Sequence, residues 1–417
     1  MRKILISAGI AAALAPGVAL ATDGYFSHGY GMKSIGMGGV GIALPQDALA
    51  PATNPAGLTM VGNRLDIGLD WFRPTRGADI VNNGAGMTGS YNGNDATDFL
   101  IPEFGYSRML NPDMAVGIAV YGNGGMNTKY KSSPFAAVGG TSPTGVDLTQ
   151  LFVAPTVAYK VNPNNSIGLS LNLAYQQFGL SGLQTSAFAG FSSDPMHFSD
   201  QGKDSSTGWG ARIGWTGQVS STVTLGATYQ SKTKMGKFDK YKGLFANQGE
   251  FDIPENYGIG IAVKATPRLT VAADVEQINY SKVAAVGDPI DSLFAGKLFG
   301  STDGPGFGWR DVTTLKLGAS YEYRSDLVLR AGFQTLRQPI PENQTLFNIL
   351  APGVVEQHVT LGATWTLANN NELTLGYMHA FKKEVNGVNS IPLSFGGGEA
   401  NLHMYEDSIG IAYGIKM

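Results

Sequence analysis

Large apolar residues alternate with small or polar residues along most of this chain, and this period of two predicts β-structure. In segment 409–417, for example, Ile409, Ile411, Tyr413 and Ile415 alternate with glycine, alanine and lysine. Successive side chains of a β-strand point to opposite faces, so each such segment has one apolar face. We count fourteen of them, at 65–71, 100–109, 114–120, 151–160, 167–175, 209–216, 222–230, 257–263, 269–276, 312–323, 327–333, 359–367, 373–381 and 409–417.

The apolar faces often end in aromatic rings, whereas the opposite faces are small or polar. Trp71, Tyr159, Trp215, Tyr257 and Phe381 are examples of such rings. Aromatic girdles at both ends of an apolar band are typical of barrels that span a lipid bilayer. In such a barrel the apolar face meets lipid and the polar face lines the lumen. We therefore predict a transmembrane β-barrel, and a soluble β-sandwich is the alternative.

The connections between these segments alternate between short and long. Six short links lie at 111–112, 162–165, 220–221, 266–267, 325–326 and 369–371. Seven longer connections lie near 75–98, 122–147, 179–207, 234–256, 282–310, 338–354 and 384–404. Short periplasmic turns and long outer loops are typical of outer-membrane barrels. Pro102 and Pro155 lie inside predicted strands, and each indicates a bulge or a misplaced boundary because proline donates no ladder hydrogen bond.

The first 21 residues have the pattern of a secretory signal peptide. Arg2 and Lys3 precede the apolar run 4–14, and Ala19-Leu20-Ala21 supplies the small residues of a cleavage site. An uncleaved membrane anchor is the alternative, which the shortness of the apolar run disfavours. Together with the barrel pattern, this leader predicts the outer membrane of a bacterial cell.

Residues 22–62 do not alternate and are rich in glycine and alanine. A fourteen-stranded barrel encloses a wide lumen, so we predict a plug over 22–62 and a barrel over 63–417. Within the plug, Asn54, Pro55 and Ala56 follow the glycine-rich stretch SIGMGGVGIA. With this motif between a glycine-rich start and the first strand, the chain resembles the FadL/TodX-type outer-membrane transporters of hydrophobic compounds. One departure is the C-terminal Met417, where such barrels usually end in phenylalanine.

The resemblance implies an all-β fold, a 14-stranded antiparallel transmembrane β-barrel with a partly helical plug, or hatch, inside the lumen. It also implies ligand capture by an apolar groove in the third and fourth outer loops and a binding pocket within the barrel. Exit is then sideways, by diffusion, where the third strand kinks. That strand ends at Gly122, Asn123, Gly124 and Gly125, and glycine tolerates a kink or bulge. A simple boundary between strand and loop is the alternative.

Two long loops carry large apolar side chains where side chains should face water. The predicted capture residues are Leu180, Leu183, Phe188 and Phe191 in the third loop and Phe238, Leu244 and Phe245 in the fourth. Four lysines beside them suit a carboxylate or the phosphates of lipopolysaccharide; they are Lys234, Lys237, Lys240 and Lys242. Packing of the loops on one another over the barrel mouth is the alternative.

Strand parity places charges of both signs in the lumen, and paired networks that brace the plug are expected there. Lys316, Arg212 and Arg330 are alternatively candidates to hold the head group of a fatty acid. Tyr25 and Phe26, near the start of the mature chain, are placed to reach into the pocket.

Several function classes are excluded or disfavoured. The net charge of −3 opposes nucleic-acid binding, and the absence of cysteine excludes thiolate metal sites and cysteine nucleophiles. The G-x-G-x-x-G match at 36–41 follows no strand, so we expect no dinucleotide cofactor. The histidines show no metal-ligand spacing, and no G-x-S-x-G motif indicates a hydrolase.

We therefore predict a monomeric, passive channel for hydrophobic molecules, with no enzymatic activity and no cofactor. Long-chain fatty acids are the favoured substrate, and outer-membrane lipid and lipopolysaccharide are the surrounding partners. An aromatic-hydrocarbon channel of the same fold and a general porin for small polar solutes are the alternatives.

Overall fold

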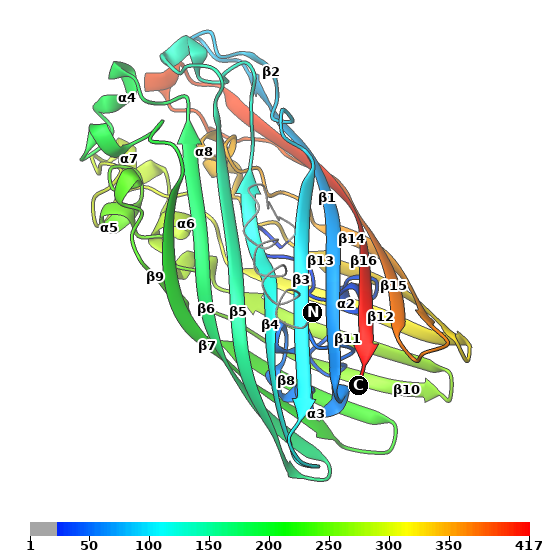
Figure 1. Cartoon of the computed structure of the whole chain (residues 1–417). Coiled ribbons are helices and arrows are strands. Elements are labelled where there is room, and N and C mark those ends of the chain that lie inside the picture. Colours follow the sequence, from blue (N-terminus) through cyan, green and yellow to red (C-terminus); the bar gives the residue numbers. More distant parts are fainter. Residues whose placement is uncertain (1–22) are drawn as a thin grey trace.

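The computed structural model describes residues 23–417, so the predicted signal peptide lies outside the described residues. Of the sixteen strands in this part of the chain, fourteen form a closed antiparallel barrel (Figure 1). They are β1 (Arg64–Val81), β3 (Phe99–Met109), β4 (Met114–Asn127), β5 (Gly145–Asn162), β6 (Asn165–Ser181), β7 (Asp204–Gln218), β8 (Val223–Gln230), β10 (Asn256–Thr266), β11 (Leu269–Ile278), β12 (Val312–Arg324), β13 (Leu327–Leu336), β14 (Gln357–Thr366), β15 (Glu372–Val385) and β16 (Glu399–Lys416). The short strands β2 (Gly89–Asn92) and β9 (Lys234–Met235) pair with β1 and β7. The predicted fold class is confirmed.

The barrel closes because β1 and β16 pair along their whole length, from Arg64 opposite Lys416 to Val81 opposite Glu399. Every other barrel strand pairs with its neighbours in sequence, apart from the short insertions. The six predicted short turns all join adjacent strands at one end of the barrel (Figure 1).

The two faces of the wall have the polarity of a membrane barrel. On β6 the outward side chains Ile167 and Leu169 are about half exposed, at 49% and 50%, whereas the inward Ser170 and Asn172 are fully buried. Apolar residues therefore face outward and polar residues face the lumen, as lipid requires. This arrangement overturns the soluble-sandwich alternative. No helix in residues 23–417 is long and apolar enough to cross a membrane.

The two strand prolines mark neither a bulge nor a strand boundary, because both lie inside strands and the ladders keep their register past them. The β5–β6 pairing lacks Ala154 and Pro155 and resumes in the same register at Thr156. Pro102 pairs with β1 in the part of β3 that has no partner on β4.

The long connections carry short helices that gather at the other end of the barrel (Figure 1). They are η3 (Ala136–Val138), α4 (Ser186–Ala189), η4 (Pro195–His197), η5 (Asp239–Tyr241), α5 (Ala246–Gly249), η6 (Tyr280–Lys282), α6 (Ala284–Gly287), α7 (Asp291–Phe294), η7 (Glu342–Gln344), α8 (Thr345–Asn348) and η8 (Leu393–Phe395). The rule for outer-membrane barrels makes this the outer end and the short-turn end the periplasmic one.

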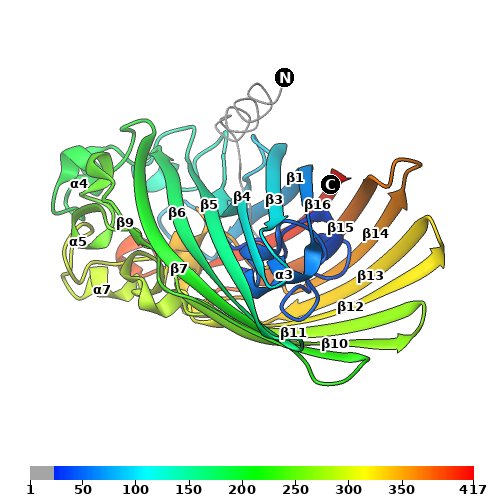
Figure 2. The same cartoon turned by 60° about the horizontal axis from the view of Figure 1, so that its bottom comes forward.

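The described residues before β1, 23–62, lie inside the ring of strands (Figure 2). It contains α2 (Met32–Ile35), η1 (Ala50–Ala52), η2 (Pro55–Gly57) and α3 (Leu58–Val61). We call residues 23–62 the plug. Almost all of its side chains from Met32 to Ala43 are buried, although the segment has little regular structure of its own.

Candidate functional site

The predicted motif Asn54, Pro55, Ala56 forms a turn that joins the plug to the wall. Asn54 Oδ1 accepts a hydrogen bond from Ala56 N at 3.1 Å and caps η2, which begins at Pro55. Asn54 Nδ2 donates to Ile42 O at 2.7 Å within the plug and to Trp215 O at 2.9 Å in β7. One buried amide therefore connects two parts of the plug to the barrel backbone.

Two wall glycines allow this close approach. A Cβ atom on Gly168 would lie 2.3 Å from Ala56 N, and one on Gly214 would lie 2.0 Å from Asn54 Oδ1. Any side chain at either position would push the plug away from the wall. Close contact of this kind accounts for part of the unusual glycine content, 57 of 417 residues.

Wall carboxylates hold the plug backbone. Asp274 Oδ2 accepts hydrogen bonds from Gly41 N at 2.7 Å and Ile42 N at 3.0 Å. Glu103 accepts one from Met32 N at 3.1 Å. Both acids are inward, as strand parity predicts, and their carboxyl oxygens attach the plug.

The three predicted head-group cations also contact the plug or the wall. Arg212 Nη1 donates to Thr53 O at 3.0 Å, and Arg330 Nε donates to a plug glutamine side chain at 2.9 Å. Lys316 Nζ lies 2.9 Å from a carboxylate oxygen of Glu276. This placement corresponds to the alternative expectation that luminal charges brace the plug, so we do not assign these residues a head group.

The ladder between β3 and β4 is incomplete in its outer half. β4 pairs with β3 only as far as Phe104 opposite Val120, although it pairs with β5 to its end. Between Gly122 and Gly124 the register with β5 shifts, which leaves Asn123 as an extra residue. The irregularity lies at the segment where sequence analysis expected a kink.

The first described residues of the chain occupy the free edge of β4. Ser27 N donates to Asn123 O at 3.1 Å, and Gly125 N donates to Tyr25 O at 3.0 Å. A Cβ atom on Gly124 would lie only 1.9 Å from Tyr25 O. The segment Tyr25–Ser27 therefore covers the luminal side of the opening between β3 and β4.

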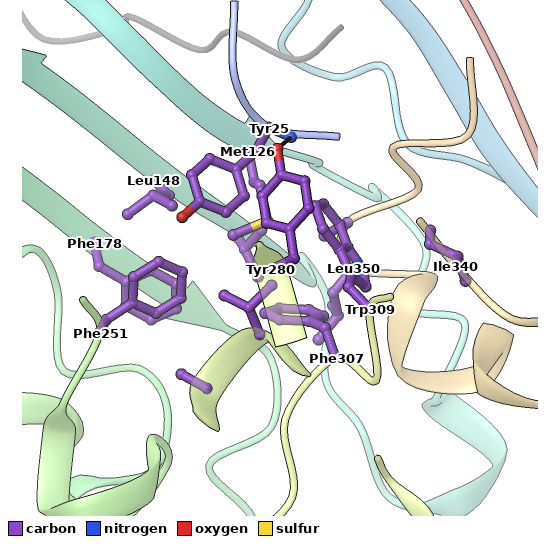
Figure 3. Close-up of a cluster of buried hydrophobic side chains, with 14 of the residues drawn as sticks. Tyr25, Met126, Leu148, Phe178, Phe251, Tyr280, Phe307, Trp309, Ile340 and Leu350 are labelled. Atoms are coloured by element: carbon purple, nitrogen blue, oxygen red, sulfur yellow. Dashed lines mark hydrogen bonds between the residues drawn. The ribbon is translucent and has the colours of Figure 1, made fainter. Parts of the chain in front are cut away.

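Tyr25 inserts its ring among three aromatic side chains (Figure 3). Its ring centroid lies 5.2 Å from that of Tyr280, 5.9 Å from that of Trp309 and 6.2 Å from that of Phe251. We call these three partner residues the aromatic cage. All four rings are fully or almost fully buried, so the cage is an apolar site between the plug and the outer loops.

Nearer the outer surface, several loops together form an apolar pocket, which we call the loop pocket. Of the predicted capture residues, Leu183, Phe188 and Phe191 line it. Further lining residues come from other loops and are Met87, Phe135, Phe198, Ile290, Leu293, Phe294, Phe299, Leu346, Phe347 and Phe395. The pocket therefore draws on more loops than the third and fourth.

The other predicted capture residues lie deeper. Phe238 and Phe245 pack on Phe178 of β6, with ring centroids 5.7 Å and 4.7 Å away, and Leu180 and Leu244 are buried with them. They form the hydrophobic core beneath the loops, which is what the loop-packing alternative expected of them.

The four loop lysines are placed on the surface around this core. Lys242 Nζ lies 3.3 Å from Asp194 Oδ2, and Lys237 and Lys240 donate to loop carbonyl oxygens. Lys234 is exposed on β9. No group of three or more potential metal ligands occurs in residues 23–417.

Comparison with known proteins agrees with this architecture. The family model described as outer membrane protein transport protein (OMPP1/FadL/TodX) matches residues 11–393. The chain belongs to this family. Members of the FadL/TodX family are outer-membrane transporters of hydrophobic compounds, and the protein is located in the bacterial outer membrane.

Individual relatives are distant but similar over their whole length. The long-chain fatty acid transport protein of Escherichia coli O6:H1 is 22% identical over 440 residues, which cover 92% of this chain and 94% of the relative. The crystal structure of the Pseudomonas putida toluene transporter TodX has a TM-score of 0.71 at 19% identity and covers 94% of this chain and 99% of its own. A Pseudomonas aeruginosa FadL homologue has a TM-score of 0.72 at 17% identity with the same coverage.

Two residues of the aromatic cage in this FadL/TodX-family protein were not predicted from the sequence. Tyr280 and Trp309 lie in or beside the connection near 282–310, where no strand alternation identifies the direction of a side chain. The only available signal was the presence of large aromatic residues in a connection that should face water.

Proposed function

We propose that the protein is a passive channel that takes up hydrophobic small molecules across the outer membrane, without enzymatic activity. The observation that carries the proposal is the position of the aromatic cage. It lies between the apolar loop pocket and the incomplete β3–β4 ladder, while the plug fills the lumen on the periplasmic side. An apolar site near an opening in the wall suits a ligand that leaves into lipid.

Three steps follow for a captured molecule. It first enters the loop pocket, where it leaves water and gains hydrophobic stabilisation. It then displaces Tyr25 from the aromatic cage, which also releases the segment Tyr25–Ser27 from β4. Finally it leaves sideways between β3 and β4 into the outer leaflet, and the rest of the plug, residues 28–62, does not need to move.

We propose long-chain fatty acids as the first substrate class. Two observations support this class: the similar Escherichia coli protein is a long-chain fatty acid transport protein, and surface lysines surround the third and fourth loops. Monoaromatic hydrocarbons are the second candidate, because the similar TodX structure is that of a toluene transporter. A general porin for polar solutes is disfavoured, since the plug lies directly on the wall at Gly168 and Gly214. We further propose that the channel acts as a monomer.

A reversible disulfide tests the route. The chain has no cysteine, so Ser27→Cys with Asn123→Cys creates a single pair that fixes the segment Tyr25–Ser27 to β4. In cells without their own fatty-acid channel, we expect labelled oleate uptake to fall to background under oxidising conditions and to recover with reductant. Labelled toluene is measured in parallel.

The control pair is Tyr106→Cys with Ile118→Cys, which lie opposite each other in the paired part of β3 and β4. Its uptake should not depend on reductant. Unchanged uptake in the oxidised Ser27–Asn123 pair would refute the lateral route. Uptake of toluene alone would assign the second substrate class, and passage of small sugars would favour a porin.

A further inference from the structure

A polar cleft opens at the outer end of the β14–β15 pair, and β16, β1 and β3 separate this pair from the β3–β4 gap in strand order. β14 pairs with β15 only as far as His358 opposite Ala380, although β15 continues to Val385. The edge of β15 above Ala380 therefore has no partner on β14. A cleft of about 850 Å³ lies beside this edge and the connection between β13 and β14. We call it the β15 notch.

Two arginines line the notch without a carboxylate partner. Arg310 Nη2 donates to Ile340 O at 3.2 Å, and its buried Nε has no hydrogen-bond partner. The side chain of Arg337 makes no ion pair or hydrogen bond with any of residues 23–417. Partial burial lowers the pKa of Arg310, and the positive charge of Arg337 lowers it further. Two cations therefore lie close together, and neither has a carboxylate of residues 23–417 within ion-pair distance.

Most acids of the notch are already engaged. Glu356 lies 2.6 Å from Lys383 Nζ, and Asp291 Oδ2 accepts a hydrogen bond from Gln344 Nε2 at 2.8 Å. Glu384 pairs with its neighbour Lys382. Glu342 is the remaining acid, and it lies near enough to Arg310 to oppose the lowering of its pKa. Of the charged groups that line the notch, the two arginines, Glu342 and Asp291 therefore have no ion-pair partner.

The notch lies at the height where the outer wall changes from apolar to charged. The outward side chains of β15 run from Leu375 and Tyr377 to Lys382 and Glu384. At the level of this change His379 Nδ1 lies 2.9 Å from Asp407. Lipid head groups meet a barrel where its apolar band ends, so the notch lies beside the phosphates of the outer leaflet.

We propose that the β15 notch binds the phosphate group of an outer-leaflet lipid through Arg310 and Arg337. Arginine guanidinium groups match phosphate oxygens in geometry and bind them in a bidentate manner. The lipid chains would lie against the apolar outer faces of β14 and β15. This site is separate from the transport route, and it does not depend on which molecule is transported.

The test measures lipid binding to the purified full-length protein in detergent, by native mass spectrometry. The probes are bisphosphorylated lipid A and the same lipid A without phosphates. We expect Arg310→Gln with Arg337→Gln to weaken binding of the phosphorylated lipid about tenfold. Binding of the dephosphorylated lipid should not change. Glu342→Gln should strengthen binding, because it removes an unpaired acid beside Arg310.

The matched control is Arg268→Gln with Arg324→Gln, which removes two exposed arginines from the periplasmic turns. Each variant is first checked for the mobility of a folded barrel in gels without heating. Equal binding by the Arg310/Arg337 variant and the wild type would refute the proposal. Displacement of lipid A by equimolar inorganic phosphate or oleate would also overturn it, in favour of a soluble anion. The assay has no uptake step, so its failure leaves the transport proposal unaffected.

Discussion

The absence of a side chain at single glycines of the barrel wall determines how closely the plug packs against the wall. Gly214 has no room for a Cβ atom, because Asn54 Oδ1 would lie 2.0 Å away. We expect Gly214→Ala to displace the Asn54 turn and to destabilise the protein by about 1–3 kcal/mol, as overpacking does elsewhere. The measurements are the temperature at which the barrel loses its folded gel mobility and the rate of proteolysis within the plug.

Gly190→Ala is the control for this substitution. A Cβ atom on Gly190, in the third outer loop, would meet nothing within 4 Å. Equal effects of the two substitutions would mean that loss of glycine itself, and not contact with the plug, determines stability.

In the proposed route, the segment Tyr25–Ser27 is an element that competes with the ligand for the aromatic cage. Because the ring of Tyr25 fills the aromatic cage, a ligand must displace it before it can bind. We expect Tyr25→Ala to bind oleate roughly tenfold more tightly, since the free energy of removing a buried ring is no longer required. Binding is measured by calorimetry on purified protein.

Tyr91→Ala, on β2 and away from the cage, should leave the affinity for oleate unchanged. Weaker binding by the Tyr25→Ala variant would show that the ring belongs to the ligand site instead of blocking it.

The strands also show where sequence periodicity stops being informative. Segment 409–417 was predicted, but β16 begins at Glu399. Its additional residues include the outward His403 and Asp407, which lie above the lipid band. There the outward face meets water and loops, so apolar alternation no longer marks a strand. The same reason explains why β1 extends beyond segment 65–71 to Val81.

The whole molecule is a wide barrel with the plug inside its lumen, and we propose that the plug keeps the lumen closed. Deletion of residues 23–62, with the leader joined to Asn63, should leave a lumen lined by charges such as Arg212 and Lys316. We expect the deletion variant to show stepwise ion conductance in planar bilayers and the wild type to show none. The Tyr25→Ala variant retains the plug and should also stay closed. Conductance of the wild type equal to that of the deletion variant would contradict closure by the plug.

The architecture could be predicted at this scale, but the internal contacts could not. Alternation along single strands, with the lengths of the connections, was sufficient for fourteen strands and a lipid-facing surface. The contact of Asn54 with Trp215, by contrast, depends on how distant strands are placed around the lumen. Tyr25 inserts into the aromatic cage, in which Phe251 comes from the fourth outer loop and Tyr280 and Trp309 come from the two ends of the β11–β12 connection. No local pattern carries that information.

The pairing of β1 with β16 also constrains how the protein is made. Arg64 pairs with Lys416, so the ring cannot close until the last residues of the chain have been synthesised and delivered. Until then the first and last strands are open edges, prone to pairing with other chains, and such distant contacts form slowly. The plug is delivered first, yet Lys33 reaches its partner Glu372 only after β15 arrives. A chain that ends before β16 therefore lacks the strand that closes the ring, and β1 and β15 stay open edges.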